Sequence, residues 1–113
     1  MFKIYSAGAM RGIEQWNFPA FKAARDGMRT RGYEVICPAE LDEAEGIVPG
    51  ETDPTPDMVR AAIRRDVLAI IDGRPDALSI LPDSFDSLGV KVEIALSRFL
   101  GMKIKPLNEW LTD

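Results

Sequence analysis

The chain has 113 residues, of which 46% are hydrophobic and 28% charged, as expected for a water-soluble globular protein with one domain, residues 1–113. Its 14 basic and 18 acidic residues give a formal net charge of −4, which argues against binding to a nucleic-acid polymer. One cysteine and no histidine exclude an internal disulfide, histidine-activated nucleophiles and histidine metal sites. Since it has no signal-peptide pattern and no apolar run long enough to cross a membrane, the sequence predicts a cytoplasmic protein.

The first predicted element is a buried strand over residues 2–6, a short apolar run. A loop with two glycines follows, from Ala7 to Gly12, and glycine lets a backbone approach a ligand closely. The spacing of these glycines fits neither the dinucleotide fingerprint nor the P-loop, so it excludes the usual NAD and Walker-type ATP sites.

A helix is predicted next, with Asn17 as its N-cap and Pro19 in its first turn, ending near Arg31. Its apolar residues recur at helical spacing and should face the core: Phe18, Phe21, Ala24 and Met28. Gly32 ends the helix, and residues 33–37 form a second strand that stops before Pro38.

Residues 40–57 contain seven acidic residues and no basic ones, which predicts a long loop with one short helical turn near residues 39–44. The spacing matches no calcium loop, and we expect a solvated acidic surface there. Thr55 and Pro56 then begin a helix that ends at Gly73, with an apolar stripe of Val59, Ile63, Val67, Ile70 and Ile71. Asp66 lies at the edge of that stripe, where a capping contact, an ion pair with Arg64 or Arg65, or a catalytic role would account for a partly buried carboxylate.

After a strand over residues 77–81, a polar loop leads to a helix that ends at Gly101. Its apolar residues, predicted to face the sheet, are Leu88, Val92, Leu96, Phe99 and Leu100. Glu93 flanks that stripe one turn after Gly89, so its carboxylate would border an open space near a helix N-terminus that favours anions. The alternative is an ordinary surface glutamate. A last strand at residues 102–105 precedes a tail in which Trp110 and Leu111 should dock on the core.

This alternation predicts an α/β fold in three αβα layers, a Rossmann-like or flavodoxin-like parallel sheet of about four strands in the order 2-1-3-4. Ligands of such sheets bind where the strand order reverses, outside the carboxyl ends of the strands. The loops 7–12 and 82–88 border that crevice, with Tyr5 at its floor and Glu93 at its wall.

Three segments resemble the nucleoside 2-deoxyribosyltransferases and the related deoxyribonucleoside 5′-monophosphate N-glycosidases. They are Lys3-Ile4-Tyr5-Ser6-Ala7-Gly8-Ala9-Met10-Arg11-Gly12, Arg65-Asp66, and Asp86-Ser87-Leu88-Gly89-Val90-Lys91-Val92-Glu93 before Leu100-Gly101-Met102-Lys103-Ile104. The chain is most similar to a small, uncharacterised branch of that superfamily, frequent in phages and bacteria, in which Ala-Gly-x-Met-Arg-Gly followed by Asn-Phe-Pro-Ala-Phe is typical.

The resemblance implies catalytic roles for three residues. Glu93 would be the nucleophile at the anomeric carbon of 2-deoxyribose, Tyr5 would orient its carboxylate, and Asp66 would protonate the departing base or hold the sugar. Paired carboxylates in different environments suit this retaining glycosyl transfer, which needs neither a metal nor another cofactor.

The resemblance also implies a substrate-binding set and a homodimer or larger homo-oligomer. Ser87 and Gly89 match positions that hold a 5′-phosphate, and Gly8, Met10 and Arg11 would line the substrate from the first loop. Arg11 fits a structural ion pair equally well, and Asn108 is the polar candidate for completing a neighbouring subunit's pocket.

The predicted function is therefore an N-glycosidase or deoxyribosyltransferase acting on a deoxynucleoside or its 5′-monophosphate, with no membrane partner. Two alternatives remain. One is a non-catalytic nucleotide-binding or sensor module, and the other is a different enzyme acting on a phosphorylated sugar or modified nucleotide.

Overall fold

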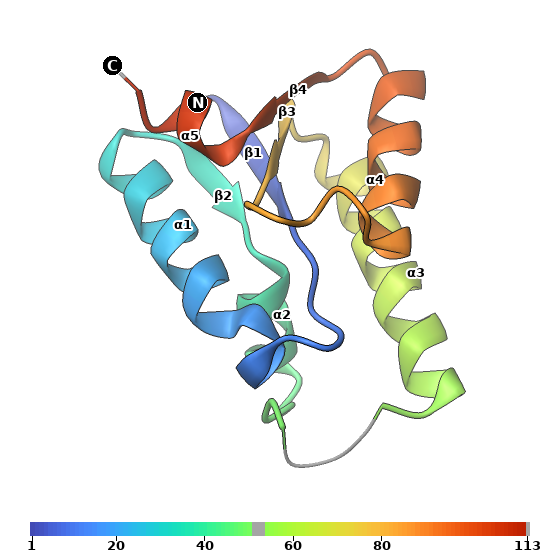
Figure 1. Ribbon diagram of the computed structural model, residues 1–113. Coiled ribbons are helices and arrows are strands. Elements are labelled where there is room, and N and C mark those ends of the chain that lie inside the picture. Colours follow the sequence, from blue (N-terminus) through green and yellow to red (C-terminus); the bar gives the residue numbers. More distant parts are fainter. Residues whose placement is uncertain (51–53, 113) are drawn as a thin grey trace.

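The parallel four-stranded sheet predicted from the alternation of elements is present, in the order β2-β1-β3-β4 (Figure 1). The computed structural model describes residues 1–50 and 54–112. The strands are β1 (Lys3–Ala7), β2 (Glu34–Ile36), β3 (Ala77–Ile80) and β4 (Lys103–Pro106). The helices are η1 (Glu14–Asn17), α1 (Phe18–Thr30), α2 (Pro38–Ala44), α3 (Pro56–Gly73), α4 (Leu88–Phe99) and α5 (Leu107–Trp110). In the described residues, no helix has the length and apolar character required to cross a membrane.

Helices cover both faces of the sheet, which gives three layers (Figure 1). Neighbouring residues of β1 point to opposite faces, as the pleat of a strand requires. Ile4 packs in the core on the side of α1 and α5, and Tyr5 packs in the core on the side of α3 and α4. Both side chains are fully buried, so β1 is the centre of the molecule rather than its edge.

Helix α1 follows the prediction on its inner face, where the four expected residues are buried: Phe18, Phe21, Ala24 and Met28. The expected capping by Asn17 is wrong. Its backbone is left-handed (φ 63°), and its side-chain amide donates to the carbonyl of Ala9 over 3.0 Å instead of capping α1. Gln15 and Trp16 also have positive φ, so three consecutive residues adopt a conformation that costs L-residues roughly 1–2 kcal/mol each.

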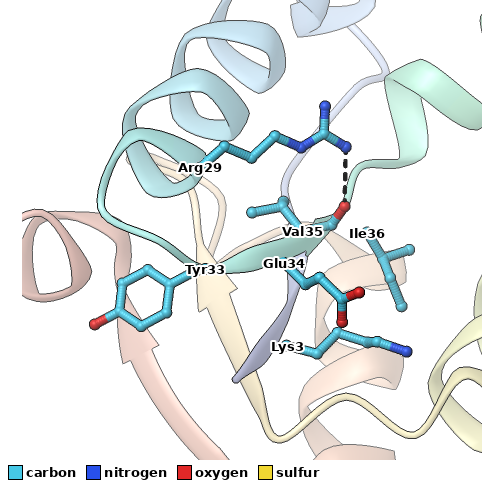
Figure 2. Close-up of a pocket in the computed structure, with 6 residues that line it drawn as sticks. All are labelled: Lys3, Arg29, Tyr33, Glu34, Val35 and Ile36. Carbon is cyan, nitrogen blue, oxygen red and sulfur yellow. Dashed lines mark hydrogen bonds between the residues drawn. The ribbon is translucent and has the colours of Figure 1, made fainter. Parts of the chain in front are cut away.

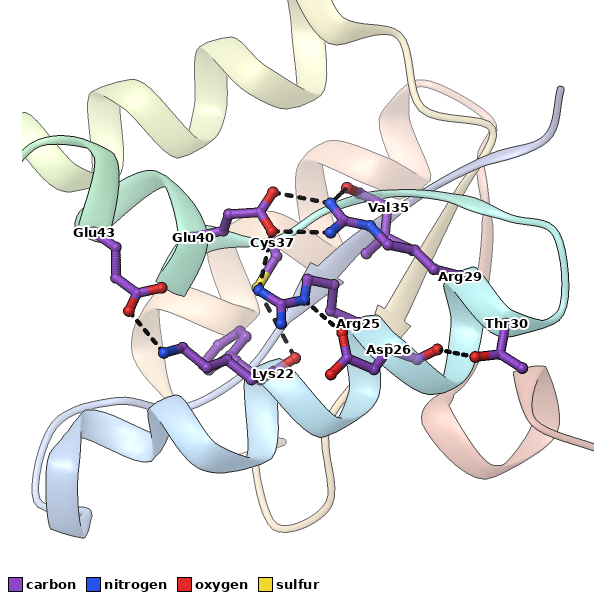
Figure 3. Close-up of polar contacts among 10 residues, drawn as sticks. Lys22, Arg25, Asp26, Arg29, Thr30, Val35, Cys37, Glu40 and Glu43 are labelled. Carbon is purple, nitrogen blue, oxygen red and sulfur yellow. Dashed lines mark hydrogen bonds and ion pairs between the residues drawn. The ribbon is translucent and has the colours of Figure 1, made fainter.

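Helix α2 is the short helical turn expected near residues 39–44, and charged groups join it to α1 (Figure 3). Arg29 binds both carboxylate oxygens of Glu40 at 2.9 Å, and Arg25 binds one of them at 3.0 Å. The hydrogen bond from Arg29 is the main reason that the pKa of Glu40 is lowered. Lys22 adds an ion pair with Glu43 at 2.7 Å. These contacts fix the first part of the acidic segment 40–57, of which residues 51–53 lie outside the described part of the chain.

Helix α3 begins as predicted, because the Thr55 hydroxyl accepts a hydrogen bond from the Met58 amide at 3.2 Å. Its predicted stripe only partly faces the sheet. Ile70 is 1% exposed, whereas Ile71 is 45% exposed, so the inward orientation expected for Ile71 is wrong.

Helix α4 is turned so that most of the predicted stripe faces away from the sheet, and Leu96 is the member of the stripe that packs, partly buried, against the core. Leu88 and Phe99 are 79% and 87% exposed, and Val92 and Leu100 are also exposed. The helix instead buries Val90, Glu93 and Ser97. A glutamate can occupy the core side because a hydrogen-bonded carboxyl costs far less to bury than an unpaired one. The predicted stripe is the more hydrophobic side of the helix. The side that packs on the sheet is instead the one from which Glu93 reaches its hydrogen-bond partner.

The end of the described chain completes the core beside α1, as expected for Trp110. Its ring lies 5.8 Å from that of Phe2 and 5.9 Å from that of Tyr33, and its indole N–H donates to the carbonyl of Lys105. Leu111 is half-buried against the same cluster.

Candidate active site

The centre of the candidate site is a hydrogen bond between two buried side chains from β1 and α4. The Tyr5 hydroxyl donates to Oε2 of Glu93 at 2.5 Å, with Tyr5 fully buried and Glu93 5% exposed. The surface-glutamate alternative for Glu93 is therefore wrong. Burial raises the pKa of Glu93 to about 8, although the Tyr5 hydrogen bond opposes that rise. Burial and the neighbouring Glu93 raise the pKa of Tyr5 well above its usual value.

Asp66 supplies the second carboxylate, from α3. Its charge acts on both Glu93 and Tyr5 and raises the pKa of each. Arg65 donates two hydrogen bonds to Oδ1 of Asp66, from Nη2 at 2.8 Å and from Nε at 3.0 Å. The ion pair expected for Asp66 thus exists, with Arg65, and it does not remove Asp66 from the neighbourhood of Glu93. Burial raises the pKa of Asp66, and the charge of Arg65 opposes the shift.

Arg65 also ties the site to α2. Its Nη1 lies 2.5 Å from Oδ1 of Asp42 and 3.2 Å from Oε2 of Glu45. Asp42 is 5% exposed, and burial raises its pKa against the effect of Arg65. The acidic composition of residues 40–57 predicts a solvated Asp42, and that expectation is wrong for this residue, which is buried against Arg65. Asp42 and Arg65 are 23 positions apart, and no spacing rule relates them.

The two loops that border the predicted crevice are joined by a hydrogen bond from the Ala9 amide to the Ser84 hydroxyl, at 2.9 Å. Ser84 is fully buried, and no motif in the sequence marks it. A side chain at Gly8 would meet the core, because a Cβ there would lie 2.4 Å from Cδ1 of Leu81 and 2.9 Å from Cζ of Phe21. Packing therefore accounts for the glycine at this position.

The other predicted substrate-binding residues have different surroundings. Met10 packs against the core beside α1, and Arg11 is exposed. Ser87 is the N-cap of α4, and its hydroxyl accepts from the Val90 amide at 3.4 Å. Around Gly89 there is space, since the nearest atom to a Cβ built there is the Ser87 hydroxyl at 3.9 Å. Ser87 and Gly89, both predicted to contact a phosphate, therefore border an open space at the first turn of α4.

A separate hollow of about 460 Å³ lies along β2, at the edge of the sheet (Figure 2). It is lined by Lys3, Arg29, Tyr33, Glu34, Val35 and Ile36. Its cations are already engaged, because Lys3 donates to the carbonyl of Gly73 and Arg29 donates to that of Val35 and to Glu40. This hollow holds none of the residues expected to act in chemistry. Among the described residues, no group of three or more acidic or cysteine side chains is placed to hold a metal ion.

The buried Glu93, the partly buried Asp66 with its Arg65, and the open first turn of α4 lie together on the α3–α4 side of the sheet. No curated protein and no solved structure matches the chain. A family model does match it, over residues 2–106, which is most of its length. The chain belongs to the family described as a domain of unknown function, DUF4406.

Proposed function

We propose that the protein is an N-glycosidase or deoxyribosyltransferase that cleaves the base–sugar bond of a deoxynucleoside or its 5′-monophosphate. The observation that carries the proposal is the buried hydrogen bond from Tyr5 to Glu93, with Asp66 close enough to shift the pKa of both groups. Active sites often contain two carboxyl groups that lie near each other and both have raised pKa values. The resemblance of the surrounding motifs to the deoxyribosyltransferases supports this choice of chemistry.

Glu93 is the proposed nucleophile. Because Tyr5 binds Oε2, we assign Oε1 to the attack on the anomeric carbon. A bond forms between Oε1 and that carbon, and the bond between the carbon and the base nitrogen breaks with its electron pair leaving on the base. Water or a second base then attacks the same carbon and releases Glu93, which gives hydrolysis or transfer respectively.

Asp66 is the proposed proton donor to the departing base. Both hydrogen bonds from Arg65 end on Oδ1, so Oδ2 is the oxygen that we assign to the substrate. Burial favours the protonated form of Asp66 and Arg65 favours the ionised form, a balance that suits a group that gives up a proton and takes it back. The same group would accept the proton of the attacking water in the second step.

The sugar or its 5′-phosphate is assigned to the space over the first turn of α4. Gly89 leaves that turn open, and the backbone amides at the start of the 12-residue helix favour an anion. Arg11, exposed on the facing loop, is a further candidate for contact with the phosphate. A reduced cysteine and a nucleotide substrate both fit the cytoplasm as the place of action.

One observation favours a second candidate, a non-catalytic nucleotide-binding or sensor module. With a pKa of about 8, Glu93 carries its proton in most molecules at neutral pH. A protonated carboxyl donates hydrogen bonds and can recognise a base or sugar, whereas a nucleophile must be ionised. The enzyme would cleave a bound nucleotide, whereas the sensor module would bind it and leave it intact.

The test is release of free base. Purified protein is incubated with each deoxynucleoside and each 5′-monophosphate, with and without an acceptor base, and the products are separated by chromatography. We expect base release by wild type, and its loss by roughly a thousandfold or more in Glu93→Gln. Glu34→Gln, an exposed glutamate on β2, is the matched control and should react like wild type. Saturable nucleotide binding without any base release would overturn the enzyme and favour the binding module, and cleavage at another bond would indicate a different enzyme.

A further inference from the structure

The guanidinium of Arg65 is shared by three carboxylates from two helices. On α3 it binds Oδ1 of Asp66, through Nε at 3.0 Å and Nη2 at 2.8 Å. Its third nitrogen, Nη1, turns to the end of α2, where it lies 2.5 Å from Oδ1 of Asp42 and 3.2 Å from Oε2 of Glu45. The Asp42 side chain is 7% exposed and that of Glu45 is 52% exposed, so the stronger partner beyond α3 is Asp42.

Helix α2 holds Asp42 in place because acids on the opposite side of this helix bind α1 (Figure 3). Glu40 and Glu43 form ion pairs with arginine and lysine side chains of α1. At about 100° per residue, these two glutamates and the pair of Asp42 with Glu45 lie on opposite sides of α2. Asp42 is therefore fixed from α1 and is not free to follow Arg65.

Both hydrogen bonds from Arg65 to Asp66 end on one oxygen of the carboxylate. Arginine commonly forms a fork, in which two nitrogens bind two carboxylate oxygens. Arg29 and Glu40 form such a fork in this protein, with both distances at 2.9 Å. Arg65 binds Asp42 at the same time, and in that position its two nitrogens nearest Asp66 both reach Oδ1. Arg65 thus leaves Oδ2 of Asp66 for a proton.

The charges around Asp66 favour the same result. They belong to Arg65 on its own helix, Asp42 and Glu45 beside α2, Tyr5 on β1 and Glu93 on α4. Burial raises the pKa of Asp66 most, Arg65 lowers it, and the two carboxylates beside α2 raise it again. An arginine paired with Asp66 alone would favour the ionised form, which has no proton to give.

We propose that Asp42 is a positioning residue for the reaction and acts through Arg65 on the proposed proton donor, Asp66. Asp42 anchors the guanidinium from α2 and offsets its charge, so that Arg65 orients Asp66 without holding it ionised. The proton that reaches the base nitrogen leaves Oδ2 of Asp66, and Asp42 itself neither gives nor takes one. The inference rests on the proposed function, because Asp66 needs a proton only if it protonates a departing base.

The first test does not depend on activity. Carbon-13 NMR of labelled aspartate follows the titration of Asp66, whose signal is identified by its absence in Asp66→Asn. In Asp42→Asn, which keeps an oxygen for Arg65 but removes the charge, the titration of Asp66 should move to lower pH. Glu45→Gln should move it in the same direction by less, since Glu45 is more exposed, and this variant decides the question if Asp42→Asn does not fold.

Glu43→Gln is the matched control, because Glu43 lies on the opposite side of α2 and pairs with Lys22. The titration of Asp66 in this variant should be that of wild type. Asp42→Glu, which restores the charge, should also titrate like wild type. Circular dichroism checks that every variant is folded.

The second test is the pH profile of base release. At a pH low enough to protonate Asp66 in both proteins, Asp42→Asn should match wild type in kcat/KM. As the pH rises, Asp66 loses its proton earlier in the variant, so the deficit should grow by about tenfold for each pH unit between the two titrations of Asp66. A purely structural role would lower the rate equally at every pH.

An unchanged titration of Asp66 in folded Asp42→Asn overturns the proposal, and so does a deficit that is the same at every pH. If Asp42→Glu titrates like Asp42→Asn, the charge of Asp42 is not what acts on Asp66, and the proposal is again wrong. If wild type releases no base from any nucleotide, the proposed function fails and the role in catalysis with it. The NMR titration still shows in that case whether Asp42 acts on Asp66.

Discussion

The Tyr5 hydroxyl donates to Oε2 of Glu93 over 2.5 Å, and this hydrogen bond joins residues 88 positions apart. It connects a central strand of the sheet to α4 and places a carboxyl group in a nearly dry part of the core. A carboxyl so buried retains its proton up to a pH of about 8. Most of the expected behaviour of the site follows from that proton.

The first prediction concerns stability against pH. The pKa of Glu93 rises from its usual 4.5 to about 8 on folding, so between these pH values the folded chain holds a proton that the unfolded chain has lost. The contribution of Glu93 is therefore fully present below pH 4.5 and declines as the pH rises to about 8, by a few kcal/mol. Glu93→Gln, which has no such proton, should lack this decline. Urea unfolding at a series of pH values measures it.

Wild type and Glu34→Gln should show the same decline in that experiment. If Glu93→Gln loses stability with rising pH as steeply as they do, then Glu93 is not the buried group that titrates.

The second prediction concerns Tyr5→Phe, which removes the only hydroxyl donating to Glu93 among the described residues. Because that hydrogen bond lowers the pKa of Glu93, its loss should move the pKa above 8. The unfolding free energy should fall by about 1–3 kcal/mol, since a buried carboxyl oxygen loses its partner. Carbon-13 NMR of labelled glutamate follows the titration, with Tyr33→Phe as the control at a tyrosine outside the site. A pKa of Glu93 that stays near 8 in Tyr5→Phe would show that the hydroxyl has no electrostatic role.

The third prediction separates nucleophile from acid in the proposed reaction. If ionised Glu93 attacks while protonated Asp66 gives its proton to the base, kcat/KM should be bell-shaped in pH, because one carboxyl must lose its proton while the other keeps one. Asp66→Asn removes the acid and also a charge that raises the pKa of Glu93, so its rate should be lower, rise to a pH below about 8 and then level off. A falling limb that persists at high pH in Asp66→Asn would mean that Asp66 is not the acid.

The fourth prediction compares two glycines beside the site. Gly8→Ala should destabilise the protein by about 1–3 kcal/mol, because its Cβ would lie 2.4 Å from Leu81. Gly89→Ala should leave stability unchanged or raise it by up to about 1 kcal/mol, since the new methyl group enters open space in a helix. Thermal unfolding measures both. A larger KM for a 5′-monophosphate in Gly89→Ala, with normal stability, would support the assignment of the phosphate to this turn.

The fifth prediction concerns the link between α2 and α3. Arg65→Met leaves Asp42 and Asp66 without their common partner, and it should cost roughly 2–3 kcal/mol of unfolding free energy. Arg60→Met is the control, because Arg60 is 81% exposed and its ion pair with Asp57 is long, at 3.7 Å. Equal stability of the two variants would mean that the Arg65 ion pairs contribute nothing to the fold.

The topology could be predicted because it depends on local signals. Apolar runs, glycine stops and the Thr55 cap mark where strands and helices begin and end, and a parallel sheet follows from their alternation. The rotation of α4 could not be predicted in this way. Its sequence offers two apolar sides, and the one that is buried includes Glu93 and Ser97 because Tyr5 is the partner of Glu93.

The candidate site, too, could be predicted from the sequence only in part, because contacts between distant residues leave no local pattern. Motifs brought Tyr5, Asp66 and Glu93 to attention, and the structure joins two of them by a hydrogen bond and the third by its charge. The part played by Asp42 depends on a contact between α2 and α3 that no local pattern encodes. The side chain of Asn17 is a similar case, because it pairs with a loop carbonyl instead of its own helix.

The central position of β1 has a consequence for synthesis of the protein. One edge of β1 pairs with β2, which follows at Glu34–Ile36, but the other edge pairs with β3, which begins only at Ala77, and the Trp110 ring that packs on Phe2 comes still later. On a growing chain, β1 therefore keeps one open edge until β3 has been made. We expect the central pairing of the sheet to form only after these distant residues have been synthesised.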